Sequence, residues 1–333
     1  MAAPFDPSIP FVRAAASTPH PIGVHAGVWV HDWSAPSART AIEGSAQAGF
    51  DLIEIPLPSH RGTAASAAMT RTLLDDNGID AVVSLALGAE TDINTEDVAV
   101  SARGEEKLLE AVAFAREIGA SYVGGVTFSA MTKYAHPATE ASRANSLDVL
   151  TRVAATASDA DIRIGLEYVN RYESNLLNTA AQTAAFITDL KQRGADNVLL
   201  HIDTYHANIE ELSQADAVKD AGKLLGYLHM AESHRGRLGT GTIDWPGLFE
   251  ALAATDYKGP LTFESFSSDI VSPATRDDIG LWRNPWNDPA EVARHAATFL
   301  REHLALSASP ISRTQPPQRI ERAHEDRNTH QRR

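Results

Sequence analysis

The chain has 333 residues, a length that fits either two average domains or one large α/β barrel. With 43% hydrophobic and 22% charged residues it is too apolar for a disordered chain, and its net charge of −14 disfavours general binding to nucleic acids or anionic membranes. The absence of cysteine excludes disulfides, cysteine-held zinc, iron–sulfur clusters and thiol nucleophiles, so any metal ion must be held by histidine, aspartate and glutamate.

The first 21 residues contain prolines, an early acidic residue at Asp6 and no unbroken apolar run. They fit neither a signal peptide nor a membrane span. We therefore expect residues 1–21 to form an N-terminal extension, and we expect a cytoplasmic protein.

From Ile22 onward, short apolar β-rich runs alternate with longer segments of helical period, the pattern of βα units around a buried parallel sheet. Eight runs are predicted strands: 22–28, 51–55, 80–87, 121–126, 161–167, 197–203, 225–230 and 260–265. Several helical segments between them begin with Ser or Asn and end with Gly, and a last helix is expected near residues 288–304. Because no linker interrupts the series, the sequence predicts a single (β/α)8 TIM barrel over residues 22–305.

The composition changes near residue 306. Residues 307–333 lack apolar periodicity and contain six arginines against three acidic residues. This is typical of a solvated, disordered end, and a weak nucleic-acid or partner arm is the less favoured alternative. We expect residues 306–333 to be a disordered Arg-rich tail, which leaves the barrel more acidic than the whole chain.

Each of the last four predicted strands has an ionisable residue at or near its end. These residues are Glu167, Asp203, His229 and Glu264. Strand ends of a barrel converge on its mouth, where active sites lie, and this set suits Mn²⁺, Co²⁺ or Mg²⁺ better than a structural zinc ion. Taken singly, each carboxylate could cap a helix or pair with an arginine, and the histidine could pack in the core. Because all four residues stand at corresponding positions of consecutive strands, a shared metal site is favoured over four separate roles.

Two further strand residues have ambiguous roles. His201 stands two residues before Asp203, on the same side of its strand, and we expect it to serve packing, with a hydrogen bond to a metal ligand as the alternative. Glu54 ends the second predicted strand, where it could orient a metal ligand or cap a helix.

Loop residues after the strands add candidate binding groups. Glu173, His206 and Arg235 follow the ends of strands five, six and seven, where substrate contacts are normally drawn from. Glu173 could simply cap a helix and Arg235 could be a surface charge. An arginine beside a carboxylate and a histidine nevertheless suits binding of hydroxyl and carbonyl oxygens.

Residues 165–180, 201–211, 226–245 and 263–268 resemble signature stretches of the ketose 3-epimerase family. This group of xylose-isomerase-like barrels includes D-tagatose 3-epimerase, D-allulose (D-psicose) 3-epimerase and L-ribulose 3-epimerase, and the likeness spans roughly residues 22–304. The resemblance implies that the metal ligands are Glu167, Asp203, His229 and Glu264. It also implies that Glu167 and Glu264 double as the catalytic pair, and that the substrate oxygens O1 to O3 are bound by Glu173, His206 and Arg235.

The family resemblance implies inversion of free ketoses at C3, as in D-allulose/D-fructose, D-tagatose/D-sorbose or L-ribulose/L-xylulose. One glutamate would remove the C3 proton, acidified by the C2 carbonyl, and the other would return a proton to the opposite face. Mn²⁺ or Co²⁺, with Mg²⁺ as a further candidate, would polarise the carbonyl and hold a cis-enediolate without any organic cofactor. Trp29 and Trp33 are candidates for stacking on the sugar.

We expect a homodimer or homotetramer with a small-molecule ketose as its partner and without nucleic acid or membrane partners. An aldose–ketose isomerase on the same barrel is the nearest alternative, and product analysis separates the two. A metal-dependent apurinic-type endonuclease is less favoured, because that class usually gathers more histidine ligands and a basic groove. A sugar-binding barrel without activity is the third alternative.

Overall fold

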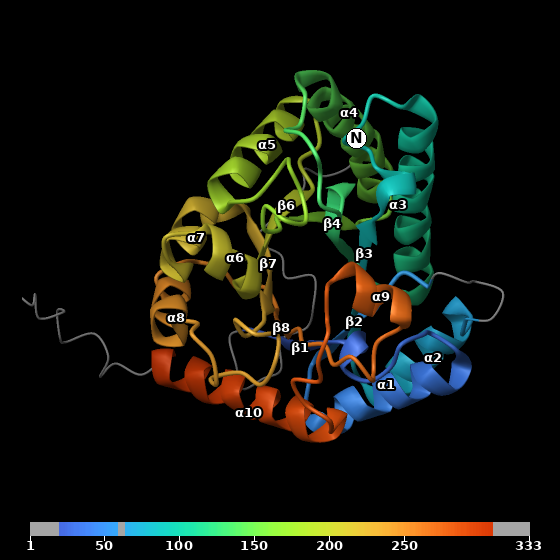
Figure 1. The fold of residues 1–333 in the computed structure, drawn as a ribbon. Helices are drawn as coiled ribbons and strands as arrows, with labels where there is room; N and C mark the ends of the chain where they lie inside the picture. Colours follow the sequence, from blue (N-terminus) through green and yellow to red (C-terminus); the bar gives the residue numbers. More distant parts are fainter. Residues whose placement is uncertain (1–19, 59–63, 309–333) are drawn as a thin grey trace, which may run out of the picture.

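The computed structural model describes residues 20–58 and 64–308, and in these residues eight parallel strands close into a barrel (Figure 1). Each strand pairs with the next, and β8 pairs with β1 to close the ring. The strands are β1 (Ile22–His25), β2 (Leu52–Pro56), β3 (Asp80–Leu87), β4 (Tyr122–Ala130), β5 (Arg163–Glu167), β6 (Val198–Asp203), β7 (Leu225–Met230) and β8 (Leu261–Phe263). The predicted TIM barrel is confirmed.

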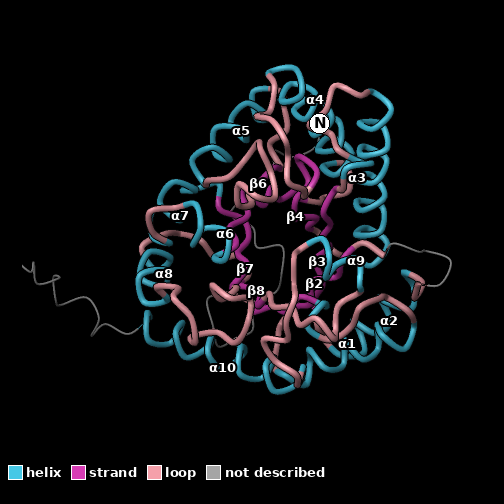
Figure 2. Tube along the Cα trace, viewed as in Figure 1, coloured by secondary structure: helices cyan, strands magenta, loops and turns pink. Residues whose placement is uncertain are grey.

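Helices form an outer ring around the strands (Figure 2). They are α1 (Ala35–Ala48), α2 (Ala67–Asn77), α3 (Val98–Ile118), α4 (Glu140–Ser158), α5 (Ala180–Gln192), α6 (Thr204–Glu210), α7 (Gln214–Ala221), α8 (Trp245–Ala253), α9 (Pro273–Asp278) and α10 (Pro289–Ala308). Short 3-10 turns are η1 (Ala26–Val28), η2 (Ala89–Thr91) and η3 (Gly222–Leu224). Two helices, α6 and α7, follow β6, and α9 is an insertion between β8 and α10.

Capping groups in the sequence set the helix ends. Ser66 and Thr139 accept hydrogen bonds from backbone N–H groups in the first turns of α2 and α4, which would otherwise lack partners. Helices α1 and α3 end at Gly49 and Gly119, both with positive φ, a conformation that costs glycine little. Local chemistry therefore fixes where these helices begin or end.

The strands are buried on both faces, as expected for a parallel sheet covered by helices. Every residue of β1, β4, β5, β6, β7 and β8 is buried. The first strand is shorter than predicted, because the chain turns into η1 after His25, whose Nδ1 accepts a hydrogen bond from the Gly27 N–H. Strand β8 ends at Phe263, which places Glu264 directly after the strand.

Most of the predicted extension (1–21) and tail (306–333) lies outside the described residues, apart from His20, Pro21 and residues 306–308, which complete α10. In the ranges that the structure does describe, each helix is too short or too polar to cross a membrane.

Candidate active site

Four ionisable side chains from consecutive strands meet at the mouth of the barrel. Glu167 ends β5, Asp203 ends β6, His229 is next to last in β7, and Glu264 follows β8. All four are buried, and one nitrogen or oxygen atom from each lies within 4.8 Å of the others. The structure therefore brings together the whole predicted ligand set.

The charges in this cluster strongly perturb one another. Burial raises the pKa of Glu167 and of Asp203, because a carboxylate is poorly solvated there. Burial alone would raise the pKa of Glu264 as well, but His229 and Arg235 outweigh it and lower that pKa. The pKa of His229 is raised, because nearby carboxylates outweigh the opposing effect of burial. Such a concentration of buried carboxyl groups favours a bound cation.

Two atoms that each lie about 2.2 Å from one ion can be at most about 4.4 Å apart, so the four donors need only a small inward movement to surround one ion. The donor set, with three carboxylates and one imidazole, is the kind that Mn²⁺, Co²⁺ and Mg²⁺ accept. The residues present therefore fit a single divalent ion.

Glu54, at β2, fixes the orientation of the His229 ring. Its Oε2 lies 2.8 Å from His229 Nε2 and accepts a hydrogen bond of 2.9 Å from the Tyr227 hydroxyl. His229 therefore donates through Nε2 and presents Nδ1 to the carboxylates of Glu167 and Glu264, at 3.2 and 3.5 Å. A histidine that binds a metal ion through one ring nitrogen usually donates from the other to a carboxylate or a carbonyl group. Of the two roles expected for Glu54, the structure shows the orienting one.

His201 lies inside the barrel, in contact with aromatic rings. Its ring makes edge contacts with those of Tyr227 and His229, at centroid distances of 4.7 and 4.2 Å. Neither ring nitrogen has a hydrogen-bond partner among the described residues, although Nδ1 lies 3.9 Å from Glu167 Oε2. Its ring contacts fit the packing role expected for it, and it also lies close enough to Glu167 and His229 to form with them a second group that could hold a metal ion.

The three predicted substrate-binding residues lie together beside the four-residue cluster. Arg235 Nη1 donates to Asp203 Oδ2 at 2.8 Å and to Glu264, and Nη2 lies 3.3 Å from His206 Nε2. His206 Nε2 also lies 4.0 Å from the Glu173 carboxylate. Glu173, His206 and Arg235 all line one pocket with Glu167, His229 and Glu264. On one side of the cluster the pocket therefore presents the guanidinium of Arg235, the imidazole of His206 and the carboxylate of Glu173.

The loop that carries Arg235 is held by a buried carboxylate that the sequence analysis missed. Glu232 is fully buried and accepts hydrogen bonds from the backbone N–H groups of Ser233 and Gly239 and from Trp245 Nε1. Arg235 has a φ of 60°, which is uncommon for a residue with a side chain. Strained backbone of this kind is kept where the surroundings determine it fully.

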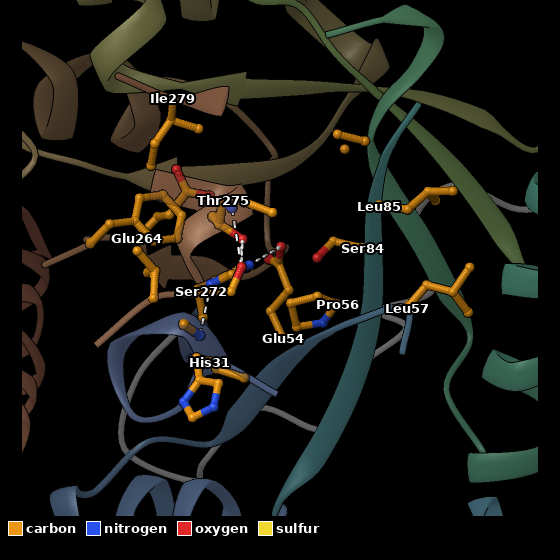
Figure 3. A pocket seen from close by; sticks show the side chains of 18 of the residues that line it. His31, Glu54, Pro56, Leu57, Ser84, Leu85, Glu264, Ser272, Thr275 and Ile279 are labelled. Carbon is orange, nitrogen blue, oxygen red and sulfur yellow. Dashed lines mark hydrogen bonds and ion pairs between the residues drawn. The ribbon is translucent and has the colours of Figure 1, made fainter. Parts of the chain in front are cut away.

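The pocket has a volume of about 750 Å³, and apolar as well as polar side chains line it together with the charged cluster. Figure 3 shows Pro56, Leu57 and Leu85 on one wall and Ser272, Thr275 and Ile279, from the α9 segment, on another. Glu54 lies between these walls in this view, and Glu264 lies on the side of Ser272 and Thr275 (Figure 3). Charged groups thus share one cavity with apolar side chains, as in small-molecule sites.

The two candidate tryptophans lie in different places. Trp33 lines the pocket and donates from Nε1 to Thr70 Oγ1 at 3.1 Å. Trp29 is not among the described residues that line the pocket, because the chain turns through η1 and its ring packs where Gly44 of α1 leaves room. The structure brings Trp33 to the site and leaves Trp29 on the helix layer.

Another pocket residue that sequence reasoning missed is His25, the last residue of β1. Its signal was present, because it too is an ionisable residue at a strand end. The predicted strand ran on to residue 28, which hid that signal. Asn170 was also missed, and its side chain bonds both Glu173 and His206.

Comparison with known proteins agrees with this geometry. Residues 42–303 match the family model described as the xylose isomerase-like TIM barrel. The chain is 45% identical over 280 residues to the L-ribulose 3-epimerase of Methylomonas sp. (strain DH-1), which covers 84% of this chain and 96% of the relative. It is 43% identical over 283 residues to the ketose 3-epimerase of Arthrobacter globiformis, covering 85% and 96%.

Solved structures give the same picture. The D-allulose 3-epimerase from Methylomonas sp. in complex with D-allulose has a TM-score of 0.82 and 43% identity to this chain, covering 88% of this chain and 99% of that one. A structure of L-ribulose 3-epimerase has a TM-score of 0.84 and 38% identity, covering 89% and 100%.

Proposed function

Because the chain belongs to the ketose 3-epimerase family of the xylose isomerase-like TIM barrels, we propose that it epimerises free ketoses at C3 with a divalent metal ion. The observation that carries the proposal is the convergence of Glu167, Asp203, His229 and Glu264 at the barrel mouth. The identity to named 3-epimerases extends over more than four fifths of the chain. The substrates proposed are D-allulose and D-fructose, D-tagatose and D-sorbose, and L-ribulose and L-xylulose.

Glu167, Asp203, His229 and Glu264 would hold the ion. When bound there, it supplies positive charge that polarises the C2 carbonyl and acidifies the C3 proton. Mn²⁺ or Co²⁺ is the proposed ion, with Mg²⁺ as a further candidate. The cytoplasmic location and the homodimeric or homotetrameric assembly stay predictions from the sequence.

Glu167 and Glu264 act as the proton-transfer pair. Their carboxylates lie 3.2 and 3.5 Å from His229 Nδ1, with Glu167 at the end of β5 and Glu264 directly after β8, and the proposal places C3 between them. One carboxylate removes the C3 proton and the other delivers a proton to the opposite face, which inverts the carbon. The two exchange roles when the reaction runs in reverse.

Arg235, His206 and Glu173 bind the O1 to O3 end of the ketose. Arg235 has a fixed guanidinium fork suited to carbonyl and hydroxyl oxygens, and it packs over the Tyr205 ring with a centroid distance of 4.0 Å. Asn170 donates to Glu173 and lies 3.0 Å from His206 Nδ1, which steadies both. Trp33 forms part of the wall beyond them.

The alternatives expected from the sequence are less well supported. The curated relatives at 41–45% identity are named 3-epimerases, which favours this reaction over aldose–ketose isomerisation. The proposed ligand set has one histidine, whereas apurinic-type endonucleases usually gather more. The intact glutamate pair also argues against a barrel that only binds sugar.

The test replaces one member of the glutamate pair. Glu264→Gln, loaded to saturation with Mn²⁺ or Co²⁺, should interconvert D-fructose and D-allulose about 10²- to 10⁴-fold more slowly than the unaltered enzyme. Glu211→Gln is the matched control, because Glu211 accepts from the Ala180 N–H outside the pocket. A Glu264→Gln protein that is folded, metal-loaded and as active as this control would refute the assignment.

A further inference from the structure

His25 is a polar residue of the pocket that the proposed mechanism does not use. It ends β1, and the pairing of Val24 with Phe263 places it one step along the ladder beside Glu264. It lines the same pocket as Glu167, Glu264 and Arg235. It therefore lies at the edge of the charged cluster, across the barrel mouth from the loops after β5 to β7.

The backbone of the following turn fixes the proton on the His25 ring. The N–H of Gly27 donates to Nδ1 at 3.0 Å, so Nδ1 accepts and Nε2 carries the hydrogen. A Cβ on Gly27 would lie 2.8 Å from Nδ1 and 3.0 Å from Phe266, so this close approach requires glycine. The Phe266 ring meets the imidazole edge-on at a centroid distance of 5.3 Å. The His25 ring is thus held in one orientation, with Nε2 as its hydrogen-bond donor.

That donor faces an acceptor that it does not reach. His25 Nε2 lies 3.9 Å from Glu54 Oε1, which is too long for a hydrogen bond. Glu54 Oε1 is buried and has no hydrogen-bond partner among the described residues, whereas Oε2 is bound by Tyr227 and His229. The Nε2 donor of His25, on a residue that lines the pocket, is thus left for a ligand hydroxyl group, which can accept from it.

We propose that His25 is a specificity-determining residue that donates from Nε2 to the C4 hydroxyl of the ketose. The inference rests on the proposed function, which places C1 to C3 between Arg235 and the four-residue cluster. The rest of the carbon chain then extends away from the loops after β5 to β7, toward β1 and β2. The first hydroxyl group beyond C3 is O4, and among the described residues His25 offers on this side a donor, Nε2, that is too far from Glu54 to bond it.

The experiment removes the hydroxyl and the donor separately and together. The kcat/KM values of the Mn²⁺-loaded enzyme are compared for D-fructose and 4-deoxy-D-fructose, in the unaltered protein and in His25→Phe. Loss of O4 should lower the kcat/KM of the unaltered enzyme about tenfold. It should lower the kcat/KM of His25→Phe less than twofold, because the donor is already gone. His25→Gln retains an amide donor, so its kcat/KM should fall by an intermediate factor between the two sugars.

His20→Gln is the matched control, since His20 precedes the same strand but bonds Gly259 O away from the pocket. In His20→Gln, loss of O4 should still lower kcat/KM about tenfold. Manganese affinity by calorimetry should be the same in His25→Phe as in the unaltered protein, which separates a substrate contact from a support of Glu54. The inference is overturned if loss of O4 lowers kcat/KM by the same factor in the unaltered enzyme and in His25→Phe. It is also overturned if that factor is below twofold in the unaltered enzyme.

The proposed function can fail independently. If the unaltered enzyme turns over no ketose with Mn²⁺ or Co²⁺, the proposed function is wrong. Calorimetric affinities for D-fructose and 4-deoxy-D-fructose then decide the His25 contact without turnover. A weaker affinity for the deoxy sugar that disappears in His25→Phe supports the contact, and equal affinities in the unaltered protein contradict it.

Discussion

Replacing Glu54 by glutamine tests whether the orientation of His229 matters for metal binding. Glu54 Oε2 accepts from His229 Nε2 at 2.8 Å and from Tyr227 at 2.9 Å, with the His229 and Glu54 side chains only 2% exposed. Glutamine keeps the shape but removes the charge that makes the imidazole a stronger ligand. Loss of such a partner typically weakens metal affinity about 10- to 100-fold, equivalent to about 1.4–2.8 kcal/mol.

The assay is calorimetric titration of the metal-free protein with Mn²⁺ and Co²⁺. Asp92→Asn is the control, because Asp92 is also a buried carboxylate that accepts from a tyrosine hydroxyl, Tyr134, at 2.6 Å, yet it does not line the pocket. We expect Asp92→Asn to bind metal as the unaltered protein does. An unchanged affinity in folded Glu54→Gln would refute the view that this carboxylate tunes His229.

Two other predictions concern substrate binding and acid stability. Arg235→Lys should lower kcat/KM for D-fructose about 10- to 100-fold, mainly through KM, because one ammonium group cannot replace a planar guanidinium whose Nη1 donates to Asp203 and Glu264 while Nη2 lies beside His206. Steady-state kinetics with saturating metal measure this, and an unchanged KM would contradict it. Burial lowers the pKa of His20 from 6.5 to about 4, although its contact with Gly259 O opposes the shift. The unfolded chain therefore binds the proton more readily, and the free energy of unfolding should fall as pH falls from 6.5 toward 4. Urea unfolding of His20→Gln should show a weaker dependence in this range, and an identical slope would exclude His20 as a source.

The barrel was predictable because each strand has a local signature. Residues 80–87 and 225–230 are apolar runs bounded by turn or helix signals, and their predicted limits coincide with β3 and β7. The first strand was predicted three residues too long, since residues 26–28 continue the apolar run. The hydrogen bond between His25 and Gly27 that ends it leaves no trace in hydrophobic periodicity.

The four-residue cluster could be predicted because barrel geometry converts strand ends into neighbours. The partner of each ligand could not. Glu54 meets His229 across 175 positions of sequence, and only the closed ring brings β2 and β7 to face each other. The position of Trp29 could not be predicted either. An aromatic residue near a strand end can face the pocket or a helix, and the Trp29 ring packs against α1 because Gly44 leaves space for it.

Proton transfer at C3 by two carboxylates can be followed by product analysis in D₂O. D-fructose is incubated with the Mn²⁺-loaded enzyme, and early product is analysed by NMR. We expect D-allulose with deuterium at C3 and unlabelled remaining D-fructose, because the returned proton comes from a second carboxyl group that exchanges with solvent. An aldose product, or D-allulose that retains the original hydrogen at C3, would contradict it.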